Sequence, residues 1–466
     1  MNPLLNLISL LGIVALCFIA WLGSENRRVI PWNVIIWGIG LQMALGLFVF
    51  VLPTRDIIAG LNDLLNAVLD ASDAGAKFLF GNILARDFAA QPGPGPAARW
   101  IARTVVPPFT AVPGDRLGTD NLDLGYIFAF RALSQIIFFS GLVALLYRLH
   151  LIQPVVKVFA KIFQKTMKIS GAESLSGAAN IFVGIESAIA VKPYLLNMTR
   201  SELCAILSSC FGSIASSVLA IYAGLLRPTF PSITGHLVSA SIMTIPACFV
   251  LSKILVPETG EPETMGNIPP DKEEEDPTKR PSPMDSLIVG ALDGVKMAVG
   301  IAAVLIAILG LLALVNKVFD GLEALPVIGF IFEYISIQNI LGALFLPLTF
   351  LTGVSLEWNE LWQASLMIGR RLFETSIPPY LTLARLNQAG EISDRAMLIV
   401  SYTLCGFTHL ASYGIFVGGL SNLIPNRRSE VSSLGVKALW AGTLATIMTG
   451  CIAGLFDFGN PAVLGR

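Results

Sequence analysis

Two short polar runs interrupt apolar stretches in different halves of the chain, and both carry groups that can bind a solute. The first run, 178–187, contains Asn180 and Glu186, and the second contains Glu374 shortly before two adjacent prolines. Ionisable groups at membrane depth are costly and are usually kept for a solute or an ion. Interrupted segments at corresponding places in two halves are typical of a transporter's binding site. The sequence therefore predicts a solute site built from both runs.

The elements that position these runs must lie in a membrane. The chain has 466 residues, of which 54% are hydrophobic and only 14% charged, whereas soluble domains carry about 25% charge. Crossing a bilayer takes about 20 residues, and the charge-poor stretches of that length are 1–24, 29–54, 126–147, 203–226, 228–252, 297–316 and 438–456. Only a multi-pass helical membrane protein fits, because backbone groups in lipid must be bonded internally. Residues 1–24 lack a basic leader, so we expect a retained helix rather than a signal peptide.

Several other classes are disfavoured by the sequence. The formal net charge of −1 implies no nucleic-acid partner, and the six cysteines lie mostly in apolar runs without metal-binding spacing. The chain contains no His-Glu-x-x-His, Gly-x-Ser-x-Gly or Walker sequence, so we expect no enzyme. A receptor would carry a signalling domain, which we do not find, and a channel would not need two gated hairpins.

Basic residues predict the orientation in the membrane. Arg27 and Arg28 follow the first apolar stretch, a set of lysines follows 126–147, and Arg427 and Arg428 precede the last stretch. Placing all three groups on the cytoplasmic side puts both termini outside the cell membrane. Residues 149–168 alternate apolar positions and lysines with helical periodicity, which predicts an amphipathic helix at the cytoplasmic interface.

The chain divides into two halves with the same order of elements. A Pro- and Glu-rich segment, 257–285, reads as a flexible cytoplasmic linker. Each half has a hairpin with a polar tip, a helix with a polar middle and a closing apolar helix, which predicts an inverted repeat. The predicted division is N-terminal scaffold helices over 1–147 with an external loop over 54–125, a first transport repeat over 148–256, the linker over 257–285, a scaffold helix and external connection over 286–335, and a second transport repeat over 336–466.

The first hairpin suggests a cation site. If 173–184 and 186–196 are two short helices, residues 183–186 form the turn between them and free backbone carbonyl groups. Those carbonyls, the Asn180 amide and a hydroxyl would be oxygen ligands suited to Na⁺. Glu186 at the tip could accept hydrogen bonds from a polar solute or exchange a proton.

The polar middles of the two long helices leave alternatives open. Ser213 lies beside Gly212, which favours a local break, whereas Ser216 and Ser217 are as easily explained as hydroxyls that bond helices. His409 could contact a solute, relay protons or simply be a satisfied packing residue.

Several motifs resemble the concentrative nucleoside transporter family, over about 76–456. They are Gly177–Gly184, Lys192–Leu195 with Thr199–Leu203, Tyr402–Phe407, and Ala441–Ala445 with Cys451–Gly454. The resemblance implies an all-α polytopic membrane protein with about eight transmembrane helices and two re-entrant helical hairpins. It also implies scaffold and transport domains, a homotrimer, and solute import by an elevator-like shift.

The resemblance also implies the site residues. Sodium would be held by Asn180, Val183, Ser213 and Ile214, the region already chosen from the residues themselves; some relatives use protons instead, and no organic cofactor is implied. The solute would lie against Gly184, Ile185, Glu186, Thr375, Ser376, Phe407, His409 and Ser412.

Three positions depart from the family pattern. The first hairpin tip is one residue shorter and lacks a glutamine. Ser376 stands where a carboxylate is expected, with Glu374 two positions earlier as a candidate substitute, and His409 replaces an asparagine. We therefore expect a divergent member that carries a nucleoside with altered contacts or a different small polar solute.

Overall fold

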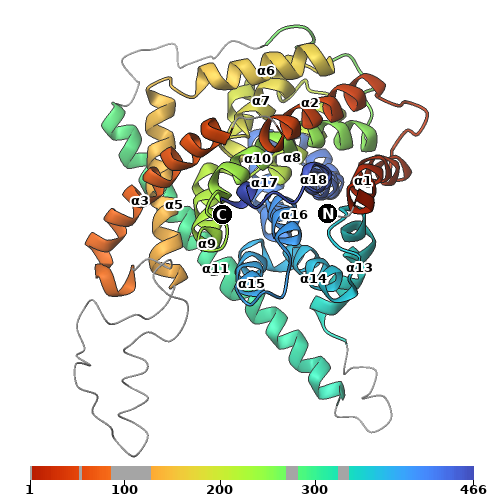
Figure 1. Ribbon diagram of the computed structural model, residues 1–466. Helices are drawn as coiled ribbons and strands as arrows, with labels where there is room; N and C mark the ends of the chain where they lie inside the picture. The colour runs from red at the N-terminus through yellow and green to blue at the C-terminus, as the bar shows by residue number, and fades with distance from the viewer. Residues whose placement is uncertain (1–2, 52–54, 86–126, 269–281, 324–334, 466) are drawn as a thin grey trace, which may run out of the picture.

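The computed structural model describes residues 3–51, 55–85, 127–268, 282–323 and 335–465. Within these ranges every regular element is a helix (Figure 1). Five of the described helices are long and apolar enough to cross a membrane: α1 (Pro3–Leu22), α2 (Trp32–Phe50), α10 (Ile233–Leu255), α11 (Pro283–Glu323) and α18 (Arg428–Phe456).

These five helices differ in how much of them the protein covers. The most apolar window is 83% buried in both α10 and α18 but only 12% buried in α11. Exposed side chains on α11 include Ile306, which is 76% exposed. The high burial of α10 and α18 places them at the centre of the molecule. Exposing the continuous apolar surface of α11 to water would be unfavourable, so α11 faces lipid or another chain.

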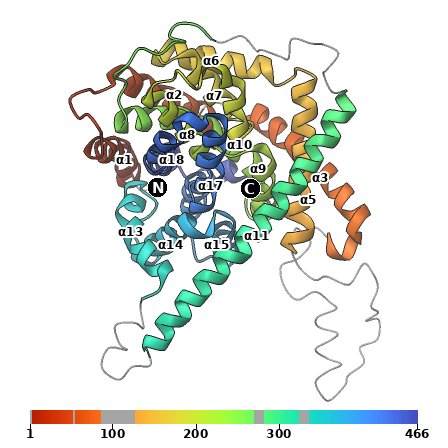
Figure 2. The ribbon, with the colours of Figure 1, turned by 180° about the vertical axis from the view of Figure 1, so that it is seen from behind.

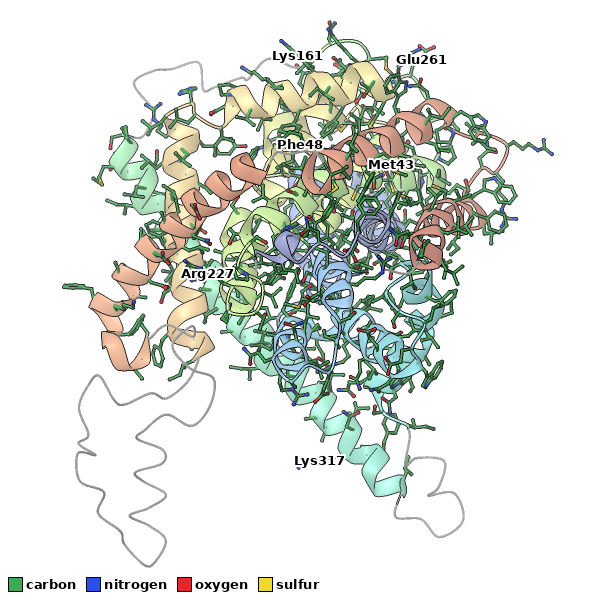
Figure 3. The ribbon with its side chains drawn as sticks, in the orientation of Figure 1. Met43, Phe48, Lys161, Arg227, Glu261 and Lys317 are labelled. Carbon is green, nitrogen blue, oxygen red and sulfur yellow. The ribbon has the colours of Figure 1, made fainter. Side chains whose placement is uncertain are left out.

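A sharp bend follows helix α5 (Phe128–Arg148). Helix α6 (Gln153–Met167) leaves it at an angle of 81°. Val156, Ala160 and Phe163 form the buried stripe of α6, while Lys161 points outward (Figure 3). The amphipathic helix predicted over 149–168 is thus confirmed as a helix, and its place at the cytoplasmic interface stays a prediction.

Two series of elements repeat the predicted order. The first is α6, α7 (Gly171–Ala179), η2 (Ile185–Tyr194), α8 (Arg200–Gly212), α9 (Ser216–Leu226) and α10. The second is α13 (Ile337–Leu351), α14 (Trp358–Glu374), α15 (Ile377–Gln388), α16 (Asp394–Leu404), α17 (Leu410–Leu423) and α18. Both hairpins are interrupted at their tips and both helices with polar middles are broken. Short 3₁₀ helices η4 (Pro425–Arg427) and η5 (Pro461–Leu464) complete the described chain.

Local sequence explains where these short helices begin and end. The Thr199 hydroxyl accepts the Glu202 N–H while the Glu202 carboxylate accepts the Thr199 N–H, which is a capping box at the start of α8. Two prolines, Pro378 and Pro379, fall in the first turn of α15, where a missing N–H costs nothing. The turn before them is made by Thr375, whose φ of +68° no helix allows.

The first hairpin turns earlier than predicted. Helix α7 ends at Ala179, residues 180–184 form the turn, and the second arm is a 3₁₀ helix that begins at Ile185. We predicted two short helical arms over 173–184 and 186–196, with the turn at 183–186. The difference arises at Asn180, which takes the C-cap of α7, because an asparagine amide competes with the backbone for hydrogen bonds.

Part of the predicted loop over 54–125 is a helix. Helix α3 (Arg55–Leu84) fills its first half, and 86–126 lie outside the described residues. The buried stripe of α3 includes Asn66, Leu69, Ser72 and Asp73. Because much of this stripe is polar, hydropathy does not reveal the helix.

Two groups of helices surround the repeats. Helix α5 packs along α11 and contacts α3 and α9 (Figure 2), and its contact with α11 is close because a Cβ on Gly290 would lie 2.8 Å from the Ser140 carbonyl oxygen. Helices α1 and α2 instead pack on α18 and α10. The loop between them is held by Glu25, whose carboxylate accepts hydrogen bonds from Arg200 and Lys437. These hydrogen bonds lower the pKa of the Glu25 carboxyl. The scaffold assigned to 1–147 therefore stays a prediction, since α1 and α2 adhere to the repeats.

The two broken helices meet at their breaks. The Phe407 N–H donates to the Phe211 carbonyl oxygen at 2.8 Å. A Cβ on Gly406 would lie 2.6 Å from the Gly212 carbonyl oxygen, and one on Gly442 of α18 would lie 2.7 Å from Phe211 Cβ. Glycines therefore allow the breaks to contact each other and α18 directly.

This contact yields a stability prediction. Gly406→Ala should lower the free energy of unfolding by about 1–3 kcal/mol, because the new methyl group meets backbone that cannot move aside. Gly414→Ala in α17 is the control, since nothing lies within 4 Å of its added Cβ. Thermal unfolding of both purified variants checks this, and equal melting temperatures would contradict it.

Candidate functional site

Oxygen atoms converge at the turn of the first hairpin. One end of the Asn180 amide lies 3.1 Å from the Val183 carbonyl oxygen and 2.7 Å from the Gly184 carbonyl oxygen, and its other end lies 3.0 Å from the Ser187 hydroxyl. Hydrogen bonding decides which amide atom sits at each end. The nitrogen at the first end would donate to both carbonyls, whereas the oxygen there would complete a cluster of acceptors suited to a cation.

The break in the first long helix borders this turn. The Asn180 amide lies 3.5 Å from Cys210 Sγ, one turn before the end of α8. Ser213 leaves the helix in extended conformation, and its buried hydroxyl has no hydrogen-bond partner among the described residues. The Ser216 N–H and hydroxyl both donate to the Phe182 carbonyl, at 3.1 and 2.8 Å, which joins the hairpin to the start of α9. The structure thus brings together the segments that carry Asn180, Val183, Ser213 and Ile214.

This donor set fits a hard cation. It offers an amide oxygen, backbone carbonyls and a hydroxyl, all neutral oxygen ligands, and a buried hydroxyl without a partner costs free energy unless something satisfies it. No cluster of His, Cys, Asp or Glu among the described residues could hold a transition metal. A monovalent ion such as Na⁺ suits the set because none of its described members is a carboxylate that would balance a higher charge.

The tip of the second hairpin caps the end of α16. Ser376 donates to the carbonyls of Leu404, at 3.0 Å, and of Gly406, at 3.3 Å. The Tyr380 hydroxyl donates to the Ser401 carbonyl at 2.7 Å. Arg371, in the preceding arm, donates to the Thr403 carbonyl. A broken helix leaves its last carbonyls unpaired, and hairpin side chains satisfy them here. Ser376 therefore has a structural contact in addition to its predicted place at the solute.

His409 and Ser412 cap the start of α17. The Ser412 N–H donates to His409 Nδ1 at 3.2 Å, and the Ser412 hydroxyl donates to the carbonyls of Phe407 and His409. An accepting Nδ1 places the proton of the neutral ring on Nε2. His409 can therefore offer a solute one N–H donor, while the Ser412 hydroxyl proton is already used. The Phe407 ring meets the His409 ring edge to face, with centroids 6.0 Å apart.

Glu374, the candidate substitute for the expected carboxylate, is bound by two neighbouring side chains. It pairs with Arg370 at 2.8 Å and accepts from Gln338 at 3.2 Å. Thr375 is buried in the turn that follows. Gly184 lies in the first turn, and the side chains of Ile185 and Glu186 lie outside the described part of the structure, so their contacts stay predictions.

Sequence reasoning missed Arg371, the last arginine before the second tip. Its side chain is 1% exposed, and Nη1 donates to the Thr403 carbonyl and, at 3.1 Å, to the Thr446 hydroxyl. The signal was present, because a charge in the apolar arm of a re-entrant hairpin is costly.

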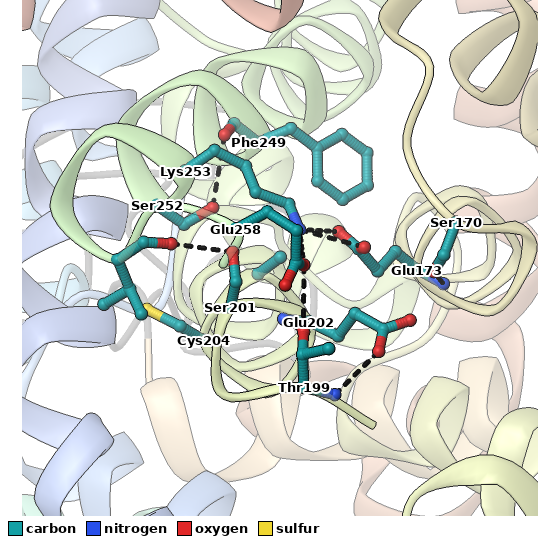
Figure 4. Close-up of polar contacts among 12 residues, drawn as sticks. Ser170, Glu173, Thr199, Ser201, Glu202, Cys204, Phe249, Ser252, Lys253 and Glu258 are labelled. Carbon is teal, nitrogen blue, oxygen red and sulfur yellow. Dashed lines mark hydrogen bonds and ion pairs between the residues drawn. The ribbon is translucent and has the colours of Figure 1, made fainter. Parts of the chain in front are cut away.

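A buried ion-pair network holds the base of the first hairpin (Figure 4). Lys253 Nζ lies 2.9 Å from the Glu173 carboxylate and 3.1 Å from that of Glu258. Glu258 also accepts from the Thr199 hydroxyl at 2.9 Å. One cation of α10 thereby joins the start of α7 to the start of α8 and fixes the hairpin against the closing helix.

Models of known protein families match most of this chain. Family models described as Na⁺ dependent nucleoside transporter N-terminus and C-terminus match residues 11–83 and 236–454, and one described as Nucleoside recognition matches 129–229. The chain belongs to the concentrative, Na⁺-dependent nucleoside transporter family.

Individual relatives support this assignment. The chain is 35% identical to an uncharacterized transporter of Haemophilus influenzae, covering 96% of this chain and 97% of that one. It is 31% identical to the nucleoside permease NupC of Helicobacter pylori, over 97% and 98%. The mouse sodium/nucleoside cotransporter 1 is also 31% identical, and the match covers 97% of this chain and 64% of that protein.

Solved structures show the same fold. CNTnw in an inward-facing substrate-bound state has a TM-score of 0.80 at 33% identity, covering 98% of both chains. A CNTnw variant in an outward-facing state has a TM-score of 0.79 at 32% identity, covering 97% of both. The predicted all-α polytopic fold with scaffold and transport domains is confirmed, and the relatives are transporters rather than enzymes.

The ion-pair network yields a prediction. Lys253→Met should lower the free energy of unfolding by about 3–5 kcal/mol, because it leaves Glu173 as an uncompensated buried charge. The double variant Glu173→Gln, Lys253→Met should recover part of that loss. Thermal unfolding measures both, and a double variant less stable than Lys253→Met would contradict the pairing.

Proposed function

We propose that this protein imports a nucleoside-class solute across the cell membrane, coupled to Na⁺, by an elevator-type movement of its two repeats. Family membership supports the class of solute and ion. The likeness to CNTnw in inward- and outward-facing states supports the movement. By analogy with the family we further propose a homotrimer with both termini outside.

One observation carries the proposed ion. The acceptor atoms around Asn180 and the unpartnered hydroxyl of Ser213 lie where the first hairpin meets the first break. A bound Na⁺ would satisfy both at once. Neither side chain titrates, so a proton could not take the same place, and the proton-coupled alternative would need a titratable group such as Glu186 or His409.

The ion drives transport only if it binds the loaded or closed state better. Here the Asn180 amide gives a physical link. With its nitrogen toward Val183 and Gly184 it bonds the turn to itself, and with its oxygen there it becomes an ion ligand. Binding Na⁺ would thus reset the hydrogen bonds of the tip that covers the solute.

The solute contacts follow from the two tips and the second break. We propose that Gly184, Ile185 and Glu186 approach from the first hairpin and Thr375 and Ser376 from the second. In the break, Phe407 offers an aromatic surface, His409 offers its Nε2–H, and Ser412 holds the histidine in that orientation.

Uptake of radiolabelled uridine and adenosine into proteoliposomes tests the function. We expect saturable uptake that increases under an inward Na⁺ gradient and does not respond to a proton gradient in choline. No saturable uptake of any nucleoside or nucleobase would contradict the proposed solute class, and equal uptake in choline would contradict the ion.

Mutation tests the ion site. Asn180→Ala and Ser213→Ala should each weaken the Na⁺ stimulation by about tenfold or more, since a charge-assisted contact contributes about 1.5–3 kcal/mol. Ser209→Ala is the matched control, because this buried serine donates only to the Ala205 carbonyl of its own helix. Unchanged Na⁺ dependence in the first two variants would remove the assignment.

A further inference from the structure

Arg371 presents one complete hydrogen-bonding edge that no described residue of the protein occupies. Its Nη1 is used by the Thr403 carbonyl and the Thr446 hydroxyl. Its Nε and Nη2, which are equally buried, have no hydrogen-bond partner among the described residues. Three N–H groups therefore remain unsatisfied on a side chain that is 1% exposed, and two of them, one from Nε and one from Nη2, share one edge.

The charge of Arg371 is also unbalanced. Among the described carboxylates none pairs with it, and the nearest in sequence, Glu374, pairs with Arg370. The titratable groups that interact with Arg371 are Tyr380, Tyr222, Cys405 and His409, and none of them supplies a negative charge while the tyrosines and the cysteine keep their protons. A buried cation without a partner is strongly destabilising, and the described residues supply no acceptor of opposite charge here.

Nε and Nη2 together have the geometry that recognises a carboxylate. The two N–H groups point in parallel and match two oxygens of a planar anion. A neutral acceptor could fill the hydrogen bonds but would leave the charge uncompensated.

Arg371 is positioned beside the proposed solute contacts. It lies in the last turn of α14, before the tip residues Thr375 and Ser376, and it bonds Thr403 at the end of α16. Thr408 in the same break also has a buried hydroxyl without a partner among the described residues. The second hairpin and second break thus share unsatisfied polar groups, while Ser376 supplies no negative charge.

We propose that the solute carries a carboxylate that pairs with the Nε and Nη2 edge of Arg371, so that acidic nucleosides or bases are preferred over neutral ones. This inference rests on the proposed function for the location of the site. A structural role of Arg371 as a cap of α16 accounts for Nη1 and leaves the other edge unexplained.

Matched ligands test the preference. Uridine and orotidine differ by one carboxylate, as do uracil and orotate. Stabilisation of the purified full-length protein in Na⁺ is titrated with all four by thermal shift. We expect half-maximal stabilisation by each acid at a concentration at least about tenfold lower than by its neutral counterpart.

Two variants locate the preference. Arg371→Lys keeps the charge and can reach the Thr403 carbonyl but lacks the parallel N–H pair, so it should reduce the preference severalfold, and Arg371→Gln should abolish it. Arg370→Lys is the control and should keep it. If Arg371→Gln does not fold, the comparison of the two lysine variants still decides.

The outcomes separate this inference from the proposed function. Binding of uridine as tight as that of orotidine would overturn the inference while leaving nucleoside transport in place, and that result is expected if Glu186 already neutralises Arg371. An acid preference unchanged in both Arg371 variants, or no binding of either acid, would also overturn it. Arg371-dependent binding of orotate without any nucleoside binding or uptake would support it and contradict the nucleoside assignment.

Discussion

Breaking a helix inside a membrane protein frees backbone groups that lipid cannot satisfy, and the architecture around both breaks follows from this constraint. The freed groups are bonded by other interrupted segments. Phe407 donates across to Phe211, Ser216 to Phe182, and Ser376 to Leu404 and Gly406. Each hairpin therefore completes the broken helix beside it. Neither the hairpins nor the breaks could be stable alone, which explains why they occur together in both repeats.

The two breaks are completed with opposite chemistry. At the first, oxygen atoms predominate, because two carbonyl oxygens and the Ser187 hydroxyl surround the Asn180 amide, and the nearby Ser213 hydroxyl has no partner among the described residues. At the second, donors exceed acceptors, because Arg371 has more N–H groups than the α16 carbonyls use. The first is suited to a cation and the second to an anion. If both sites are filled, the two bound charges attract each other through a poorly polarisable interior, which would couple their binding without any direct contact.

The sequence predicted features that depend on local signals. Pro378 and Pro379, and Gly212 beside Ser213, mark interruptions that the structure contains, and apolar length identified α10 and α18. Features that depend on tertiary contacts were not predicted from the sequence. The buried stripe of α3 is polar because it packs on polar groups of α5 and α10: the Thr234 hydroxyl donates to Asn66 at 2.9 Å and the Gln135 amide donates to Asp73 at 3.4 Å. Arg371 was missed because its partners, Thr403 and Thr446, are distant in sequence. The turn at Asn180 was misplaced because amide and helix compete for the same groups.

The contacts that complete the breaks differ from the atoms proposed to meet the solute, and this difference explains how a family can keep its fold while its solute changes. The contacts that complete the breaks use mainly backbone atoms, short hydroxyls and glycines, such as Gly406 against Gly212. These contacts fix the backbone path of the hairpins and breaks. The side-chain atoms of the tips that take no part in these contacts can differ between family members. His409 illustrates this: its Nδ1 accepts from the Ser412 N–H as any short acceptor at the helix start could, which leaves its Nε2–H available for the proposed solute. Ser376 stands where the family resemblance implies a carboxylate; its hydroxyl donates to the Leu404 carbonyl at the end of α16, which an ionised carboxylate could not do, and it carries no charge. Selection on the solute can therefore act on a few side-chain atoms without disturbing the backbone pairing that the movement requires.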